Sequence, residues 1–566
     1  MNYLDWIVLG GTVAFIVLYG VWRTRATATM EGYLKGDNTM KWWMIGVSIM
    51  ATQASAVTFL STTGQGIEDG MRFLQFYFGL PLAMIIISAT IVPIYYRLKV
   101  YTAYEYLESR FDRKTRYLTA GLFLILRGLS AGITLYAPSL VLSTLFGWPM
   151  TLTTLLIGSL VIVYVVLGGT KAVSITQRQQ MAVIMSGMIL AGILAWRLLP
   201  GHVSFGDTVT MAGELGKLNL VNLKFNPNDR YNVWSGLIAG TFLFLAYFGT
   251  DQSQVARYLG GASLTESRLG LVFNGLLKIP MQFLILFIGV LVSIFYLFHQ
   301  PPVYHNQVLK NQAFETSMAD TLAMQEIAYD ALYKQKRVAV DELVDAIHSS
   351  DAVAVDRSAT MVKELQAQER LLRDSVKKNI GRALKTEKTN DQDYIFLNFV
   401  LNNLPHGVIG LLLAVIFLAA MSSMASELNA LASTTCMDIY RQVKPGGKDV
   451  HYLAASRWFT LLWAVLAMVF TTLARFADNL IQFVNIVGSL FYGTILGIFM
   501  TAFYLKRVGG TAVFVAAIIS EIIVLMCYKF TAIAFLHYNL IGCASVIILS
   551  LVFTVLSGKR HAELKP

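Results

Sequence analysis

Residues 51–66 read ATQASAVTFLSTTGQG. They extend an apolar stretch that begins near residue 42, yet glutamine, serine and threonine crowd the middle, and Gly64 and Gly66 close the segment. A backbone inside a lipid bilayer must satisfy its own hydrogen bonds, so irregular segments occur only where they line a cavity. The pattern predicts a helix that is broken here and turns free carbonyls toward a site. A Ser/Thr-rich face packed between close helices is the alternative.

The composition of the whole chain is that of a membrane protein. Of 566 residues, 55% are hydrophobic and 14% are charged, and the mean hydropathy is +0.57, whereas ordinary globular chains carry about 25% charged residues. The net charge of +11 does not call for a nucleic acid partner, because membrane proteins collect Lys and Arg on their cytoplasmic side. The three cysteines, Cys436, Cys527 and Cys543, fit no metal spacing and are expected to be small core residues.

Thirteen stretches are apolar and long enough to be membrane spans, for which a helix needs roughly 20 residues. The connecting loops fit an external N-terminus and a cytoplasmic C-terminus, because Lys and Arg gather in alternate short loops. We therefore expect an all-α integral membrane protein embedded in the lipid bilayer of the plasma (bacterial inner) membrane. The predicted spans lie near 4–22, 42–66, 72–97, 117–146, 149–168, 179–199, 233–251, 269–299, 405–435, 456–475, 479–505, 511–528 and 531–556.

One polar segment, 301–395, interrupts this pattern and divides the chain into parts 1–300, 301–395 and 396–566. Its sequence, for example MADTLAMQEIAYDALYKQKRVAVDELVDAI from residue 318, has apolar residues at helical spacing and no span-length apolar run. The loop pattern predicts that it is extracytoplasmic and soluble. It is either a helical hairpin that caps the external face or a module that senses or binds a partner.

The ninth predicted span carries a row of serines. Ala419, Ser422, Ser423 and Ser426 fall on one helical face, at spacings of three and four. Such a face offers hard oxygen atoms of the kind that a dehydrated Na⁺ prefers. Serine-rich helix packing is the alternative interpretation.

Three ionisable residues are predicted to lie deep in the membrane. Arg127, Lys278 and Glu427 each fall roughly 12–16 Å from the cytoplasmic ends of their spans, near mid-bilayer. Intramembrane charges are costly and are usually paired or functional. Equal depth makes mutual contact possible, so both structural ion pairing and direct contact with solute or ion stay open.

Four motifs, in this order, resemble those of the sodium:solute symporters. They are EGYLKGDNTMKWW (31–43), TAYEYLESRFDRKTR (102–116), YVVLGGTKAVSITQRQQ (164–180) and SSMASELNALASTTCMDIYR (422–441). Residues 79–111 and the later LYAPSL look closest to the multivitamin, monocarboxylate and iodide branch. The resemblance extends over nearly the whole chain outside 301–395.

This resemblance implies the architecture and the activity. The fold would be of the LeuT type, with two five-helix inverted repeats, one extra helix before them and two after them. The first helix of each repeat would be broken, around Ala51–Gly64 and around Tyr247–Asp251. The function would be Na⁺-driven uptake of a small organic solute or anion by alternating access, with no enzymatic activity and no obligate protein partner.

The resemblance also implies site residues. The main Na⁺ site would use carbonyls of Ala51, Ala54 and Ala419 and the hydroxyls of Ser422 and Ser423. The candidate substrate and gate residues are Thr58, Tyr77, Tyr247, Lys278 and Asn485, of which Tyr247 would be the inner gate. Lys278 falls where sugar-transporting members place a substrate-contacting lysine.

One departure from the family pattern concerns charge. Gln177 stands where other members have an aspartate that helps to bind a second Na⁺, which puts a second ion in doubt. Glu427 lies one turn beyond Ser423 and is the one acid that the sequence places at this depth. We therefore predict a charge network of Glu427, Gln177 and Arg127, in which Glu427 supplies the missing carboxylate. A purely structural pair between Glu427 and Arg127 is the alternative.

Rival function classes have weaker support. A channel would need a selectivity filter, and no filter motif is seen. An enzyme would need a metal cluster, a nucleophile elbow or a phosphate loop, and none of these motifs occurs. A transporter-like nutrient sensor that signals through 301–395 is the remaining alternative.

Overall fold

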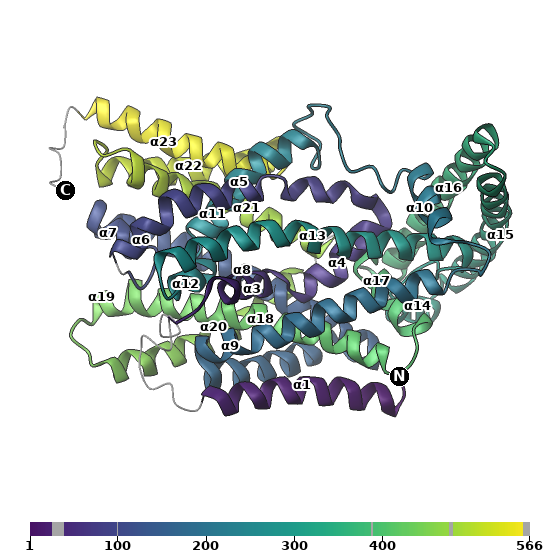
Figure 1. Ribbon diagram of the computed structural model, residues 1–566, viewed down its shortest axis with the longest axis horizontal. Coiled ribbons are helices and arrows are strands. Elements are labelled where there is room, and N and C mark those ends of the chain that lie inside the picture. Colours follow the sequence, from purple (N-terminus) through teal and green to yellow (C-terminus); the bar gives the residue numbers. More distant parts are fainter. Residues whose placement is uncertain (25–38, 99, 387–388, 475–478, 558–566) are drawn as a thin grey trace.

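The computed structural model describes residues 1–24, 39–98, 100–386, 389–474 and 479–557 (Figure 1). Within these ranges the chain is helical and has no strand beyond an isolated bridge between Met40 and Gly261. Most long helices run side by side along one axis, and a helical hairpin stands at one end (Figure 1). The predicted all-α class is confirmed.

The first half of the chain begins with α1 and the pair α3–α4, and several short helices then lead to two long ones. Their bounds are α1 (Tyr3–Thr24), α3 (Trp42–Gln53), α4 (Ala56–Asp69), η2 (Gly70–Tyr77), α5 (Leu80–Ile86), η3 (Ile87–Ile91), α6 (Val92–Leu98), α7 (Glu105–Arg110), α8 (Arg113–Phe146), α9 (Met150–Arg197) and α10 (Phe205–Glu214).

Helix α9 contains two of the predicted spans. The hydroxyl oxygens of Tyr164 and Thr176 lie 2.7 Å apart, although twelve residues of straight helix would separate them by about 18 Å. The helix therefore cannot be straight between these two residues, and the chain bends sharply there.

The second half contains a second interrupted helix, the hairpin and the C-terminal helices. Their bounds are η4 (Ser235–Ala239), α11 (Gly240–Gly249), α12 (Gln252–Leu259), α13 (Leu264–Phe298), α14 (Gln307–Phe314), α15 (Ala319–Ser349), α16 (Ala352–Leu384), α17 (Gln392–Asn403), α18 (Val408–Thr434), η5 (Thr435–Tyr440), α19 (Arg441–Val443), α20 (Asp449–Ala474), α21 (Leu480–Tyr504), α22 (Gly510–Phe530) and α23 (His537–Leu556).

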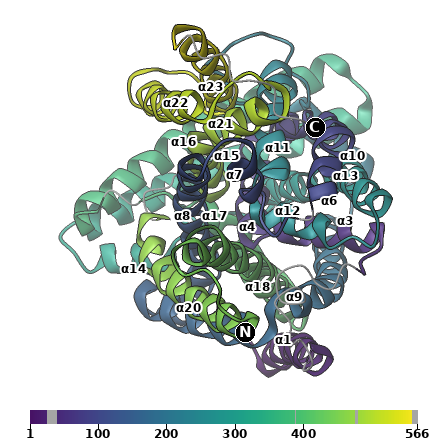
Figure 2. The same cartoon turned by 90° about the vertical axis from the view of Figure 1, so that its left-hand side faces the viewer.

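All thirteen predicted spans coincide with helical segments. Among the described residues, nine helices are long and apolar enough to cross a membrane, and three shorter apolar helices accompany them. The exact number of crossings stays a prediction, because length and composition alone give these figures. Figure 2 shows α1 on one flank of the bundle and the α22–α23 pair on the opposite flank, with α4 and α18 between them. Residues 31–38 of the first motif lie outside the described ranges.

Both expected helix breaks are present. Helix α3 ends at Gln53, Ala54 has ψ 71° and Ser55 is extended with ψ 169°, and α4 then begins. The second break falls at Thr250 and Asp251, between α11 and α12. Each break frees the last carbonyls of the preceding helix, which must find other donors.

The polar segment forms a long antiparallel hairpin, α15–α16. It shares a small apolar cluster with the chain that leads into it, including Tyr304, Tyr329 and Ile380. Val340 and Val362, however, join the main apolar core of the helical bundle. The hairpin thus packs against the bundle, at the end opposite α7 and α19 (Figure 1).

Candidate functional site

The serine face of α18 meets the first helix break. Ser422 donates a hydrogen bond to the carbonyl of Ala51 at 3.2 Å, and Ser423 donates one to the carbonyl of Thr52 at 3.0 Å. These carbonyls are free because α3 stops at Gln53 and offers them no helical donor. Two helices more than 360 residues apart in the sequence thus place four neutral, hard oxygen atoms together.

The other two predicted Na⁺ positions lie close to this group in the fold. Ala54 is the residue at which α3 ends, and Ala419 precedes Ser422 by one turn of α18. Both are fully buried. A set of carbonyl and hydroxyl oxygens without a full charge suits a dehydrated Na⁺, so the residues present fit this ion.

Gln177 joins the same polar cluster from α9. Its amide Nε2 donates to Ser422 Oγ at 3.1 Å and to Ser426 Oγ at 3.2 Å, and its Oε1 accepts from Ser48 at 2.6 Å. Arg257 of α12 also donates to Ser426, at 2.7 Å. The Gln177 amide therefore orients the serines by donating to them. A carboxylate at the same position would instead attract a cation.

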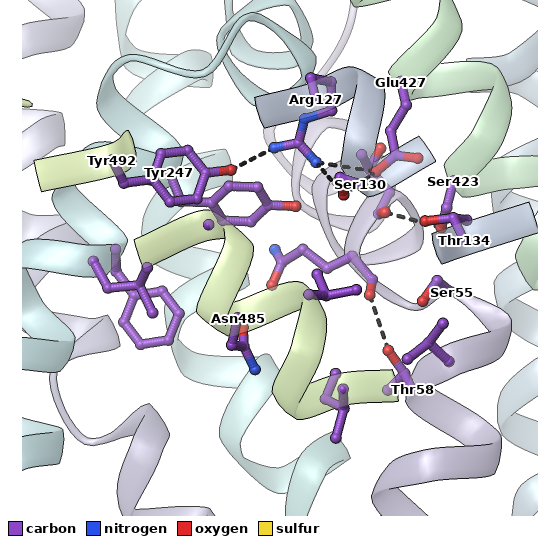
Figure 3. A pocket seen from close by; sticks show the side chains of 18 of the residues that line it. Ser55, Thr58, Arg127, Ser130, Thr134, Tyr247, Ser423, Glu427, Asn485 and Tyr492 are labelled. Carbon is purple, nitrogen blue, oxygen red and sulfur yellow. Dashed lines mark hydrogen bonds and ion pairs between the residues drawn. The ribbon is translucent and has the colours of Figure 1, made fainter. Parts of the chain in front are cut away.

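Arg127 is the centre of a second network. Its guanidinium forms an ion pair with Glu427 at 3.0 Å and donates to the hydroxyl of Tyr492 at 2.5 Å (Figure 3). It also forms an ion pair with Asp251. Tyr492 in turn donates to Asp251 at 2.8 Å. Ser130, one turn along α8 from Arg127, donates to Glu427 at 3.0 Å.

Asp251 corrects the expectation that Glu427 is the one acid at this depth. Asp251 caps the N-terminus of α12 by accepting from the backbone of Ser253 at 2.9 Å, and its other oxygen faces Arg127. The segment YFGTDQ contained the signal, because an aspartate directly after a helix break is a favoured N-cap. Tyr492 was missed because nothing in its own helix distinguishes it from other buried tyrosines.

The predicted charge network is therefore split in two. Glu427 and Arg127 pair, whereas Gln177 belongs to the serine cluster. Lys278 belongs to neither network. Among the described residues its ammonium makes no hydrogen bond or ion pair, although it is buried, and it lies 5.9 Å from the ring centre of Tyr77.

A cavity of ≈110 Å³ lies between these networks (Figure 3). Its walls come from the first break and from α4, η2, α8, α11, α13, α18 and α21. Eight residues that the sequence singled out line it, namely Thr58, Tyr77, Arg127, Tyr247, Lys278, Ser423, Glu427 and Asn485. The structure thus brings the predicted gate and substrate residues to the same space as Ser423 of the predicted Na⁺ site.

The cavity has an aromatic wall and a polar floor. Tyr77 stacks on Phe244 with ring centres 5.8 Å apart. The hydroxyl of Tyr247 accepts from Gln254 at 2.7 Å, and the Tyr247 ring lies 5.5 Å from the Arg127 guanidinium. The amide nitrogen of Asn485 is buried and makes no hydrogen bond within the described ranges, so it is available to a ligand.

The solved structure of a Na⁺-coupled sialic acid symporter, in a substrate-bound outward-open state, has the same fold. It covers 100% of this chain and 99% of its own length, with a TM-score of 0.75 and 21% sequence identity. The predicted LeuT-type fold is thereby confirmed.

Curated relatives match over part of the sequence. Human sodium-coupled monocarboxylate transporter 1 is 30% identical over 273 residues, which is 48% of this chain and 44% of that protein. A putative sodium-dependent multivitamin transporter of Drosophila melanogaster is 31% identical over 268 residues, 47% of this chain and 43% of that protein. The human sodium/iodide cotransporter is 29% identical over 244 residues, 43% of this chain and 38% of that protein. The chain thus spans less than half the length of these relatives.

Residues 33–329 and 369–520 match the sodium:solute symporter family. The stretch between them, 330–368, lies within α15 and α16, so the unmatched part is narrower than the expected insertion at 301–395. The match covers most of the chain and includes both helix breaks, the serine face and the cavity. The chain belongs to the sodium:solute symporter family.

Proposed function

We propose that this protein is a secondary active transporter that couples inward movement of Na⁺ to uptake of a small anionic solute. The observation that carries the proposal is the double role of Ser423. Its hydroxyl bonds the Thr52 carbonyl at the helix break, and the same residue lines the cavity. An ion held at the break would therefore fix part of the wall that the solute meets.

This shared wall gives a physical basis for coupling. Thr52 and Gln53, the last residues of α3, also line the cavity. Na⁺ coordination would hold their carbonyls in one arrangement, and a solute that prefers this arrangement would bind more tightly. The coupling free energy between two such sites is reciprocal and typically amounts to about 1–3 kcal/mol.

A single Na⁺ at this cluster is the stoichiometry that the residues favour. The position of the missing aspartate is occupied by the Gln177 amide, whose N–H groups point at Ser422 and Ser426. The Arg257 guanidinium also donates to Ser426. N–H donors toward these oxygens oppose a second cation beside them.

The charges around the cavity favour a monoanionic solute such as a carboxylate. Arg127 is matched by two acids, whereas the buried ammonium of Lys278 has no anionic partner among the described residues. A buried unpaired charge is costly, and a solute carboxylate would relieve that cost. One Na⁺ and one monoanion would enter together without changing the net charge of the region.

We also infer the orientation in the membrane. The end of the bundle with α7 and α19 holds many basic residues, including Arg113, Lys114 and Lys444, whereas the hairpin stands at the other end (Figure 1). Basic short loops are typical of the cytoplasmic side. The hairpin and the N-terminus would then be external, and the C-terminus cytoplasmic.

The test is uptake of radiolabelled carboxylates, with neutral amide analogues as controls, into proteoliposomes. Uptake of a carboxylate should require an inward Na⁺ gradient and should fall to background with K⁺ or choline. Undiminished uptake under a proton gradient without Na⁺ would contradict Na⁺ coupling. Equal uptake of a carboxylate and its amide would contradict the anionic solute while leaving Na⁺ coupling intact.

A further inference from the structure

A second cavity lies between the helical hairpin and the bundle, away from the central site. Its volume is ≈370 Å³. The lining comes from the end of α4, the loop after α10, α13, α15, α16 and the start of α17. Five Lys and Arg side chains line the cavity. Which of them pair with acidic side chains determines whether the cavity can bind an anion.

Three of the five lining cations have acidic partners. Lys336 pairs with Glu369. Arg373 and Lys377 share one carboxylate, that of Asp391, at 3.0 and 2.9 Å. Glu68 also lies near Arg373 and Lys377, so it balances the second charge of this group.

The other two cations, Lys217 and Arg370, make no ion pair among the described residues, and the cavity is also lined by Asp374, one turn from Arg370 on α16. The Lys217 ammonium donates to the carbonyls of Ile67 and Glu68 at 2.7 and 2.6 Å, which are neutral acceptors. Burial, and to a smaller extent the positive charge of Arg370, lower the pKa of Lys217 to about 8, against the opposing influence of Asp69 and Glu68. The five cations exceed the three lining acids and Asp391 by one positive charge, which favours an anion between Lys217 and Arg370.

The position of Lys217 is fixed by the backbone around it. Its carbonyl accepts from the backbone N–H of Met71 at 2.8 Å. Gly70 has φ 68°, and a Cβ there would lie 2.2 Å from the Lys217 carbonyl oxygen, so only glycine allows this approach. The ammonium is therefore held at the end of α4, preorganised to face the hairpin.

We propose that this cavity binds a small oxyanion between Lys217 of the bundle and Arg370 of the hairpin. The guanidinium presents N–H groups in a fork that suits a carboxylate, sulfate or phosphate. The amides of Gln366 and Asn390 line the same space and add neutral donors. A bound oxyanion would link the hairpin to the end of the broken helix α4. The site does not depend on the Na⁺ cluster or on the identity of the transported solute.

The experiment is isothermal titration calorimetry of the purified full-length protein with sulfate, phosphate and malonate. The ionic strength is kept constant, Na⁺ is left out and chloride is the background anion. The wild-type protein should bind at least one of these oxyanions saturably. Arg370→Gln should weaken the binding about tenfold or more, since one charged hydrogen-bonding partner is lost. The matched control is Arg357→Gln, an exposed arginine on the same helix, which should bind as the wild type does.

The outcomes separate clearly. Preference for malonate would indicate a dicarboxylate ligand, and preference for phosphate or sulfate an inorganic one, and both support the site. No saturable binding of any of the three anions would overturn the proposal. Equal weakening in Arg357→Gln would also overturn it, because the effect would then be one of overall charge. Arg370 is exposed, so its substitution does not threaten the fold.

Discussion

At the residue scale, neighbouring side chains on α18 serve different networks. Ser422 and Ser423 turn to the carbonyls of the first break, whereas Glu427, one turn further on, turns to Arg127. The hydroxyls of Ser422 and Ser423 thus reach carbonyls of another helix, where an ion could be coordinated. The hydroxyl of Ser433, in contrast, donates to a carbonyl of its own helix at 3.0 Å and serves only packing.

Ser423→Ala should weaken Na⁺ binding about ten- to a hundredfold, because the ion loses one hydroxyl ligand in a site that water does not reach. The loss of a hydrogen bond to a charged group has a similar free energy. The measurement is Na⁺-dependent quenching of tryptophan fluorescence, or the Na⁺ concentration for half-maximal uptake. Ser433→Ala is the matched control and should leave the Na⁺ constant unchanged. The same Na⁺ constant in both variants would mean that the serine face only packs.

Glu427→Gln should lower Na⁺ affinity by about tenfold, because a negative charge one helical turn from Ser423 is removed in a region of low dielectric. The fold should survive, since Asp251 still neutralises Arg127. Na⁺-dependent uptake and the melting temperature report the two effects separately. An unchanged Na⁺ constant, with loss of folding that Arg127→Gln restores in the same chain, would instead assign Glu427 a purely structural role.

Lys278→Met keeps the length of the side chain and removes its charge. We expect the KM for a carboxylate solute to rise about tenfold or more, the loss typical of a charged hydrogen bond. Na⁺ binding measured without solute should not change, because Lys278 contacts neither network. Arg268→Gln, on the same helix but outside the cavity, is the control. An unaltered KM would remove Lys278 from the solute site.

At the element scale, the two helix breaks are similar in form but differ in how their carbonyls are satisfied. At the first break, serines of α18 donate to Ala51 and Thr52. At the second break, tyrosine hydroxyls do so, from Tyr95 to Gly249 at 2.9 Å and from Tyr104 to Thr250 at 3.0 Å. A bulky ring beside each carbonyl leaves no room for an ion there. We therefore propose a structural role for the second break and place the Na⁺ site at the first.

Tyr104→Phe should therefore destabilise the protein by about 1–3 kcal/mol, because the buried Thr250 carbonyl loses its side-chain donor. The melting temperature should fall while the Na⁺ constant stays as in the wild type. Tyr504→Phe, at a half-exposed tyrosine, is the control. A shift in Na⁺ affinity larger than the loss of stability would argue that the second break also holds an ion.

At the scale of the whole molecule, the hairpin and the basic loops lie at opposite ends of the bundle (Figure 1). The hairpin packs apolar residues such as Val340 into the main core, so it cannot rearrange independently of the bundle without exposing that surface. The proposed orientation therefore predicts which end of the bundle a reagent outside the cell can reach.

A membrane-impermeant maleimide should label Gln368→Cys, on α16, in intact cells. It should label Lys448→Cys, in the loop before α20, only after permeabilisation, because the positive-inside rule places that loop in the cytoplasm. Both positions are exposed, and Cys436 and Cys543 are buried, so only Cys527 has to be replaced in the background. The reverse pattern would invert the proposed topology.

The local sequence was sufficient to predict the helical class, the approximate spans and the first helix break, whereas the second break was expected only from the family resemblance. Each of the features predicted locally depends on a continuous stretch of chain: apolar length for a span, and crowded polar residues for the first break. The cavity residues Thr58, Tyr77, Tyr247, Lys278 and Asn485 were also predicted, from the family resemblance, and the structure brings them together.

Only the tertiary structure decided which charges pair. Distance along a helix gives the depth of a residue, at 1.5 Å per position, but not its neighbour across the interface. Arg127, Lys278 and Glu427 have similar predicted depths, yet Arg127 pairs with Glu427 and Asp251 while Lys278 faces the cavity. The rotation of each helix about its axis, set by packing against its neighbours, fixes these partners, and no single segment of the sequence encodes that rotation.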